Sequence, residues 1–144
     1  MLTYVLLYLH CEKSENKMVE YSTSLKNEGN MKLKDVAEML NGRVVSGSEN
    51  LDKEVEFAFS SDLMSDVLTV QKDNMILLTG LANVQALRTA EMSDISCIVF
   101  VRNKKVNADM LKLGKESGIV LIECPSSMFR ASGVLFNNGL KPVY

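Results

Sequence analysis

The stretch SSDLMSDVL, residues 60–68, places hydroxyl and carboxylate groups directly after the apolar run VEFAF. Asp62 and Asp66 are four residues apart, so on a helix they would share one face and offer Mg²⁺ two oxygen ligands. In a structural role, Ser61 or Asp62 would cap the helix, and acids in its first turn would complement the helix dipole. We favour capping, because metal sites normally have more than two ligands.

The serines of the same stretch raise a different hypothesis. Ser60, Ser61 or Ser65 could accept a phosphate, which adds a charge of roughly −2 and changes a docking surface. The stretch is therefore a candidate site for metal-dependent catalysis, for phosphorylation or for partner recognition.

Hydrophobic periodicity predicts the elements that position these residues. A first helix over residues 33–40 stops at Asn41-Gly42, strands follow at 43–45 and 54–59, and a short helix covers 62–70. Apolar strands then alternate with helices: strands at 75–78, 97–101 and 119–122, and helices at 82–92, 108–116 and 126–136, the last two stopped by Gly118 and Gly139. This alternation predicts a three-layer α/β/α fold with a mostly parallel sheet of about five strands.

Ligands of open parallel sheets bind beyond the carboxyl ends of the strands, so the residues that follow each strand are the candidates. We therefore expect ligand or partner binding to involve Ser61, Asp62, Asp66, Thr79, Gly80, Asn83, Arg102 and Ser126.

Each strand end also has a structural interpretation. The turn Thr79-Gly80 could present free N–H groups to an anion, or could be a tight turn in which Thr79 helps to cap. Arg102 with Lys104 and Lys105 could hold a phosphate or carboxylate, or could be solvated loop charge. Ser126-Ser127 is first an N-cap and second a hydroxyl pair for a ligand.

Composition excludes several function classes. The 144 residues fit one domain, and a net charge of −2 with nine aromatics, none of them Trp, disfavours nucleic-acid binding. Three cysteines, Cys11, Cys97 and Cys124, argue against a disulfide framework and predict a cytoplasmic protein. The only histidine is His10, so no histidine triad or zinc site is expected after residue 30. We expect no catalytic residues, no metal and no cofactor beyond a nucleotide-like ligand.

Residues 1–30 differ from the rest. The apolar run at 2–9 is too short to span a membrane and lacks the basic region of a secretory signal, and residues 11–30 are polar with little periodicity. We expect a flexible leader or a mis-assigned start, with Met31 as the true first residue, and a single α/β domain over residues 31–144.

Several segments carry a resemblance to a known family: MKLKDVAEMLNGRVVSG, FAFSSDLMSDVL, MILLTG, the paired strands CIVFV and IVLIECP, and SSMFRASGVL. Together they resemble the DRTGG domain, a small α/β module related in architecture to the N-terminal domain of HPr kinase/phosphorylase. The sequence departs from that pattern at Arg102-Asn103-Lys104-Lys105, which replaces a Thr-Gly-Gly-like turn. The loss of glycines there makes close backbone approach to a ligand less favourable.

The resemblance implies a function as well as a fold. The stand-alone form occurs in anaerobic bacteria, often encoded near iron-only hydrogenase components and anti-sigma-type serine kinases. Elsewhere the module lies between CBS domains of nucleotide-regulated pyrophosphatases. We therefore expect a non-catalytic regulatory module, a homodimer, that binds a small anionic ligand or a protein partner in redox or kinase signalling. The alternatives are a phospho-acceptor and a metal-dependent enzyme using Asp62 and Asp66.

Overall fold

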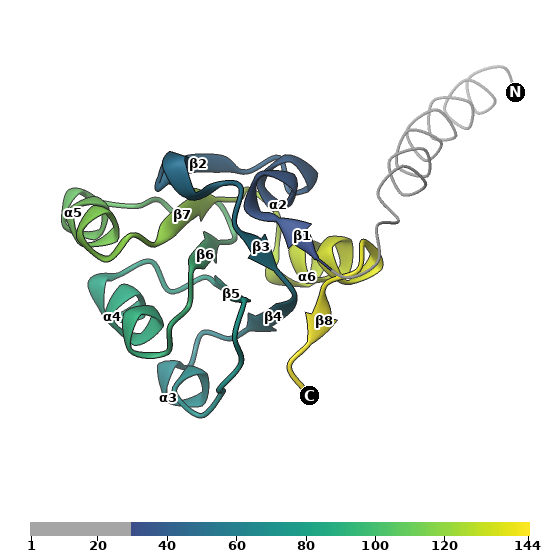
Figure 1. Cartoon of the computed structure of the whole chain (residues 1–144). Helices are drawn as coiled ribbons and strands as arrows, with labels where there is room; N and C mark the ends of the chain where they lie inside the picture. Colours follow the sequence, from purple (N-terminus) through teal and green to yellow (C-terminus); the bar gives the residue numbers. More distant parts are fainter. Residues whose placement is uncertain (1–29) are drawn as a thin grey trace, which may run out of the picture.

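The computed structural model describes residues 30–144, and the expectation about a leader or a mis-assigned start lies almost entirely outside them. Figure 1 shows the arrangement of the elements. In chain order they are β1 (Met31–Lys32), α2 (Leu33–Met39), β2 (Arg43–Ser46), the 3₁₀ helix η1 (Ser48–Asn50), β3 (Glu54–Val55), β4 (Phe57–Ser60), α3 (Met64–Val67), β5 (Met75–Thr79), α4 (Val84–Met92), β6 (Cys97–Phe100), α5 (Ala108–Ser117), β7 (Val120–Glu123), α6 (Met128–Asn137) and β8 (Lys141–Pro142).

The main sheet has six strands in the order β2-β7-β6-β5-β4-β8. All neighbouring pairs are parallel except β2 and β7, which are antiparallel. A separate antiparallel pair joins β1 to β3. The prediction of a mostly parallel sheet is thus confirmed, with an antiparallel strand at one edge.

Helices cover both faces of the main sheet, as the alternation of strands and helices predicts. Along β5, Ile76 and Leu78 face the core formed with α2 and α6, whereas Met75 and Leu77 face the core formed with α3, α4 and α5. Figure 1 shows the same division, with α3, α4 and α5 on one side of the strands and α2 and α6 on the other. Both cores are apolar because the central strands are buried on both faces. Over residues 30–144, every helix is too short or too polar to pass through a bilayer.

Side-chain caps fix where the longer helices begin. Asn83 accepts a hydrogen bond from the Ala86 amide at 3.0 Å, and Asn107 accepts one from the Met110 amide at 3.0 Å. At α6 the cap is Ser127, whose Oγ accepts from the Arg130 amide, so Ser126 of the predicted Ser126-Ser127 cap is not the capping residue. The predicted stop at Gly118 is confirmed, with φ at +68°.

Two predicted elements differ in the structure, and β8 was not predicted. The single strand at 54–59 is two strands in different sheets, because the chain changes sheet at Glu56, whose amide donates to the Asn74 carbonyl. The helix over 62–70 is only Met64–Val67, and its N-cap, Leu63, has no side-chain acceptor, so the predicted serine cap is wrong. Finally, β8 is an additional short strand, because Lys141 and Pro142 pair with the edge of β4.

Candidate functional site

Three residues from two other strand ends, Thr79, Gly80 and Arg102, donate hydrogen bonds to Asp62. Its Oδ1 accepts hydrogen bonds from the Thr79 hydroxyl at 3.0 Å and from the Gly80 amide at 2.6 Å. Its Oδ2 accepts from Nη2 of Arg102 at 3.0 Å. We call Asp62, Thr79, Gly80 and Arg102 the Asp62 cluster. It joins the ends of β4, β5 and β6, where parallel α/β sheets bind ligands.

The charge of Asp62 is stabilised in place. Partial burial opposes ionisation, but the Gly80 amide, the Thr79 hydroxyl and the Arg102 guanidinium outweigh it and lower the pKa of the carboxyl group. The Asp62 and Arg102 side chains are 43% and 50% exposed, so solvent weakens the ion pair between them. Asp62 therefore acts mainly through directed hydrogen bonds that orient the turn and the guanidinium.

Gly80 lets the Arg102 side chain lie close to the backbone. A Cβ on this residue would overlap the guanidinium of Arg102, which lies directly against the Gly80 backbone. The Leu81 amide donates to Thr79 Oγ1 at 3.1 Å, so Thr79 helps to form the turn. This agrees with the interpretation of Thr79-Gly80 as a tight turn. The anion at this turn is the chain's own Asp62 carboxylate.

The turn after β6 keeps a glycine-like backbone without glycine. Arg102 and Asn103 have φ of +59° and +57°, a region that side chains other than Asn and Asp rarely adopt. Their amides donate to the carbonyls of Ser126 and Cys124 at 2.8 and 3.0 Å. The turn thereby carries the Arg102 side chain back over Gly80 and fixes it against the start of the segment leading to α6.

A second carboxylate, Glu123 at the end of β7, was missed by sequence reasoning. Its side chain is 4% exposed. One oxygen accepts from the Val106 amide at 2.9 Å, and the other accepts from Arg43 at 2.8 Å and from Lys105 at 3.4 Å. Burial opposes ionisation, but these donors outweigh it and lower the pKa of Glu123. The signal in the sequence is a lone acid within the apolar run IVLIEC.

The remaining predicted residues are not part of the Asp62 cluster. Ser61 Oγ accepts from the Leu63 amide at 3.0 Å, Asn83 caps α4, and Ser126 offers its carbonyl to Arg102. Asp66 is an exposed residue of α3. Because α3 begins at Met64, Asp62 and Asp66 do not share a helical face, contrary to the prediction. Among residues 30–144, no three His, Cys, Asp or Glu side chains are grouped to hold a metal.

Lysine and arginine side chains supply positive charge around this edge of the sheet. Arg43 and Lys105 pair with Glu123, and Arg102 pairs with Asp62. Lys104 is exposed and has no ion-pair partner within residues 30–144. Helices α4, α5 and α6 also begin at this edge and direct the positive ends of their dipoles toward it.

Both described cysteines are buried and free. Burial raises the pKa of the Cys97 thiol. The Cys124 thiol donates to the Leu40 carbonyl at 3.6 Å. Cys97 is therefore a core residue of β6, as the sequence predicts.

No family model and no curated protein matches this chain. A solved structure does: the CBS and DRTGG domains of the regulatory region of Clostridium perfringens pyrophosphatase, complexed with its activator, diadenosine tetraphosphate. The TM-score is 0.61 at 12% identity, over 76% of this chain and 47% of the other, so this chain spans about half the length of that protein. The likeness and the three-layer architecture agree with the resemblance in the sequence: the chain has a DRTGG-like α/β fold.

Proposed function

We propose that this chain is a cytoplasmic regulatory module, without catalysis of its own, that binds an anionic, nucleotide-like ligand at the carboxyl-end edge of the sheet. The observation that carries the proposal is the Asp62 cluster, which holds Arg102 beside the turns after β4 and β5. An arginine oriented in this way is suited to bind phosphate oxygens.

The donors that such a ligand needs are present. A guanidinium carries five N–H groups, and one Arg102 nitrogen donates to Asp62. Lys104, two residues along, adds a cation with no ion-pair partner in the described part of the chain. The turn that carries both cations lies beside the segment that leads to α6, because the Arg102 amide donates to the Ser126 carbonyl.

The structural neighbour supports the class of ligand. Its solved complex contains diadenosine tetraphosphate as an activator, a polyanion with two nucleosides. A fold of the same kind is thus found within a region that responds to a nucleotide. We extend this from that protein to the present chain as a proposal, along with a role in hydrogenase-linked or serine-kinase signalling.

A thermal-shift screen with ATP, diadenosine tetraphosphate and phosphorylated metabolites tests the proposal, followed by calorimetry on each hit. A ligand at one hundred times its Kd stabilises the protein by about 2.7 kcal/mol. We expect Arg102→Ala to weaken binding at least about tenfold, a loss of about 1.4 kcal/mol. Lys115→Ala, at the far end of α5, should leave the Kd unchanged.

Two results would contradict this function. If no anionic compound in the screen raises the melting temperature, the proposed ligand binding is contradicted. Turnover of a nucleotide or phosphorylated metabolite that disappears in Asp62→Ala would make the chain an enzyme.

Phosphorylation is a second candidate because Ser60 and Ser65 are exposed on either side of Asp62. A phosphate on either residue would place about two negative charges beside the carboxylate that holds Arg102. Mass spectrometry of the protein isolated from cells in several growth states tests this role. Unmodified serines in every state would exclude it.

A further inference from the structure

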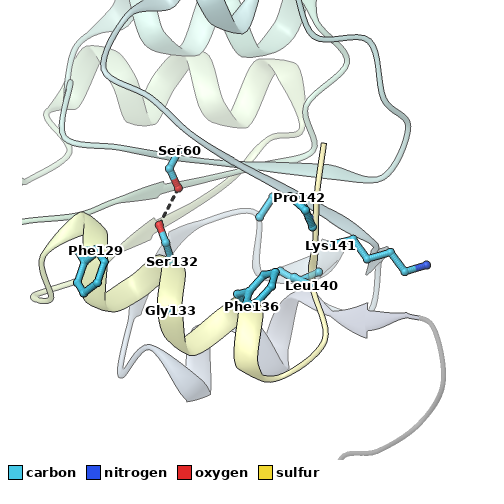
Figure 2. Close-up of a pocket in the computed structure, with 9 residues that line it drawn as sticks. Ser60, Phe129, Ser132, Gly133, Phe136, Leu140, Lys141 and Pro142 are labelled. Carbon is cyan, nitrogen blue, oxygen red and sulfur yellow. Dashed lines mark hydrogen bonds between the residues drawn. The ribbon is translucent and has the colours of Figure 1, made fainter. Parts of the chain in front are cut away.

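Helix α6 carries two phenylalanines that the monomer leaves in solvent. Phe129 is 92% exposed and Phe136 is 64% exposed. They are seven residues apart, and Ser132 and Gly133 lie between them on the same face of the helix. Figure 2 shows the two rings with Ser132 and Gly133 along one side of α6. We call these four residues the α6 stripe.

The α6 stripe borders a cavity of about 340 Å³ between α6 and the short edge strand β8. Leu140 and Pro142 contribute to its other wall. Ser60 at the end of β4 bonds to Ser132 across it, with 2.8 Å between the two hydroxyl oxygens. The exposed rings and the cavity together form a mostly apolar surface, although Lys141 also lines the cavity.

No contact within residues 30–144 explains the glycine at position 133. Glycine in the interior of a helix is less favourable than alanine, because it loses more backbone freedom on folding. A Cβ on Gly133 would meet no atom within 4 Å. The residue is exposed, and its φ is not positive. Glycine at this position would be of benefit if something outside residues 30–144 approached the helix backbone closely.

The α6 stripe is symmetric about its own midpoint. Phe129 and Phe136 are equally distant from the point between Ser132 and Gly133. A two-fold axis through that point would set two α6 helices antiparallel, with Phe129 of one copy opposite Phe136 of the other. The small residues would meet at the axis, where backbones approach most closely. Such a self-complementary surface is what a two-fold interface requires.

We propose that the α6 stripe is the contact surface of a homodimer. A phenylalanine buries about 150–250 Å². Four rings would therefore supply a substantial part of the roughly 1,200–2,000 Å² of a standard interface. Arg130 is the single charged residue of α6 and lies outside the stripe. Lys141, which also lines the cavity, is paired with Glu56 at 2.8 Å.

The neighbouring sheet edge does not offer an alternative contact. Strand β8 pairs with two of the four residues of β4, and its Pro142 has no N–H to donate to an added strand. Packing of helix against helix thus fits this side of the molecule better than addition of a strand. The expected dimer is modest in area, with a Kd on the order of micromolar.

Sedimentation velocity on the full chain over a range of about 1–200 μM tests the dimer. We expect the wild type to pass from monomer to dimer in this range. Gly133→Glu should raise the Kd at least about tenfold, because it places two carboxylates against each other at the axis. The monomer tolerates this change, since the space is open and Glu is a good helix former. Circular dichroism and the melting temperature verify the fold.

Met92→Glu is the matched control, because Met92 is 76% exposed at the end of α4, away from α6. It should leave the Kd unchanged. A wild type that stays monomeric at every concentration overturns the proposal. So does a dimer that survives Gly133→Glu, or one that Met92→Glu disrupts equally. A monomer whose α6 amides become unprotected against hydrogen exchange when residues 1–29 are removed would assign the surface to that segment instead.

Discussion

Asp62 lies two residues beyond β4 and Glu123 is the last residue of β7, and the two carboxylates have similar partners. Each accepts a hydrogen bond from the backbone amide of a neighbouring turn, Gly80 for Asp62 and Val106 for Glu123. Each also accepts from an arginine that comes from a different strand end. The acids at this edge therefore hold loops and cations in place.

Replacement of Glu123 by Gln tests this role. At pH 7 we expect the free energy of unfolding to fall by about 1.5–3 kcal/mol, the range for hydrogen bonds to charged groups. Urea denaturation of both proteins measures the difference. Glu116→Gln, at an exposed position of α5, is the control and should change stability little.

The effect of Glu123 should depend on pH in one direction. Its pKa in the folded protein lies below the ordinary value of 4.5, so the unfolded chain takes up the proton first as the pH falls. The stability that the carboxylate contributes is complete above about pH 4.5 and is lost as the pH drops through the folded pKa. The gap between wild type and Glu123→Gln should narrow in acid, and a gap that stays constant would contradict the assignment.

For single residues of the candidate site, the sequence predicts their identity better than it predicts their role. Asp62, Thr79, Gly80 and Arg102 were all candidates, and the structure brings them together. The pairing of Asp62 with Arg102 could not be predicted, because it joins residues forty positions apart through the turn after β6. Glu123 was missed, because an acid inside an apolar strand pattern gives no indication of its distant cationic partners.

The turn after β6 decides the geometry of the candidate site at the scale of an element. The consecutive residues Arg102 and Asn103 adopt the left-handed conformation although neither is glycine. Their amides donate hydrogen bonds to the segment before α6. Without glycine, this conformation is held by its hydrogen bonds and by the pair between Arg102 and Asp62.

A pair of substitutions at Arg102 measures the backbone strain separately from the ion pair. Arg102→Gly and Arg102→Ala both remove the guanidinium, but only glycine adopts the left-handed conformation without penalty. We expect the glycine variant to be more stable than the alanine variant by about 1 kcal/mol. Chemical denaturation gives the comparison. An alanine variant of equal or higher stability would show that position 102 does not hold a positive φ.

Helices and strands were predicted correctly where the hydrophobic period of a segment and its length indicate the same kind of element. Errors occur where the two indications differ. The helices α4, α5 and α6 and the strands β5, β6 and β7 were predicted within a few residues, because their apolar patterns are long and bounded by Asn, Ser or Gly. The run at 54–59 alternates as one strand would, and nothing local marks the change of sheet at Glu56. Strand β8 has two residues and owes its existence to pairing with β4.

Residues 30–144 form two apolar cores, one on each face of the central sheet. The same strands contribute to both, since Leu77 and Leu78 are neighbours in β5 and point to opposite cores. Strands β5, β6 and β7 contribute side chains to both cores, so neither core can form without them. The described domain should therefore unfold as one cooperative unit.

Leu77→Ala and Leu78→Ala test this cooperativity. Both side chains are fully buried, and each substitution should lower the free energy of unfolding by about 2–5 kcal/mol. Far-UV circular dichroism and hydrogen exchange of amides on both faces should report the same destabilisation in each variant. Loss of protection confined to the helices on the mutated side would show two independent units.

The hydrogen bond between Ser60 and Ser132 has a thermodynamic consequence for the molecule as a whole. Ser60 touches α6, and Asp62, two residues further on, centres the cluster that holds Arg102. One short piece of backbone thus belongs to both surfaces. If a ligand shifts this piece when it binds, it changes the free energy of contacts on α6, and those contacts change the affinity for the ligand by the same factor. If the proposed ligand and the proposed dimer both form, this segment would link ligand binding at one edge to assembly through α6.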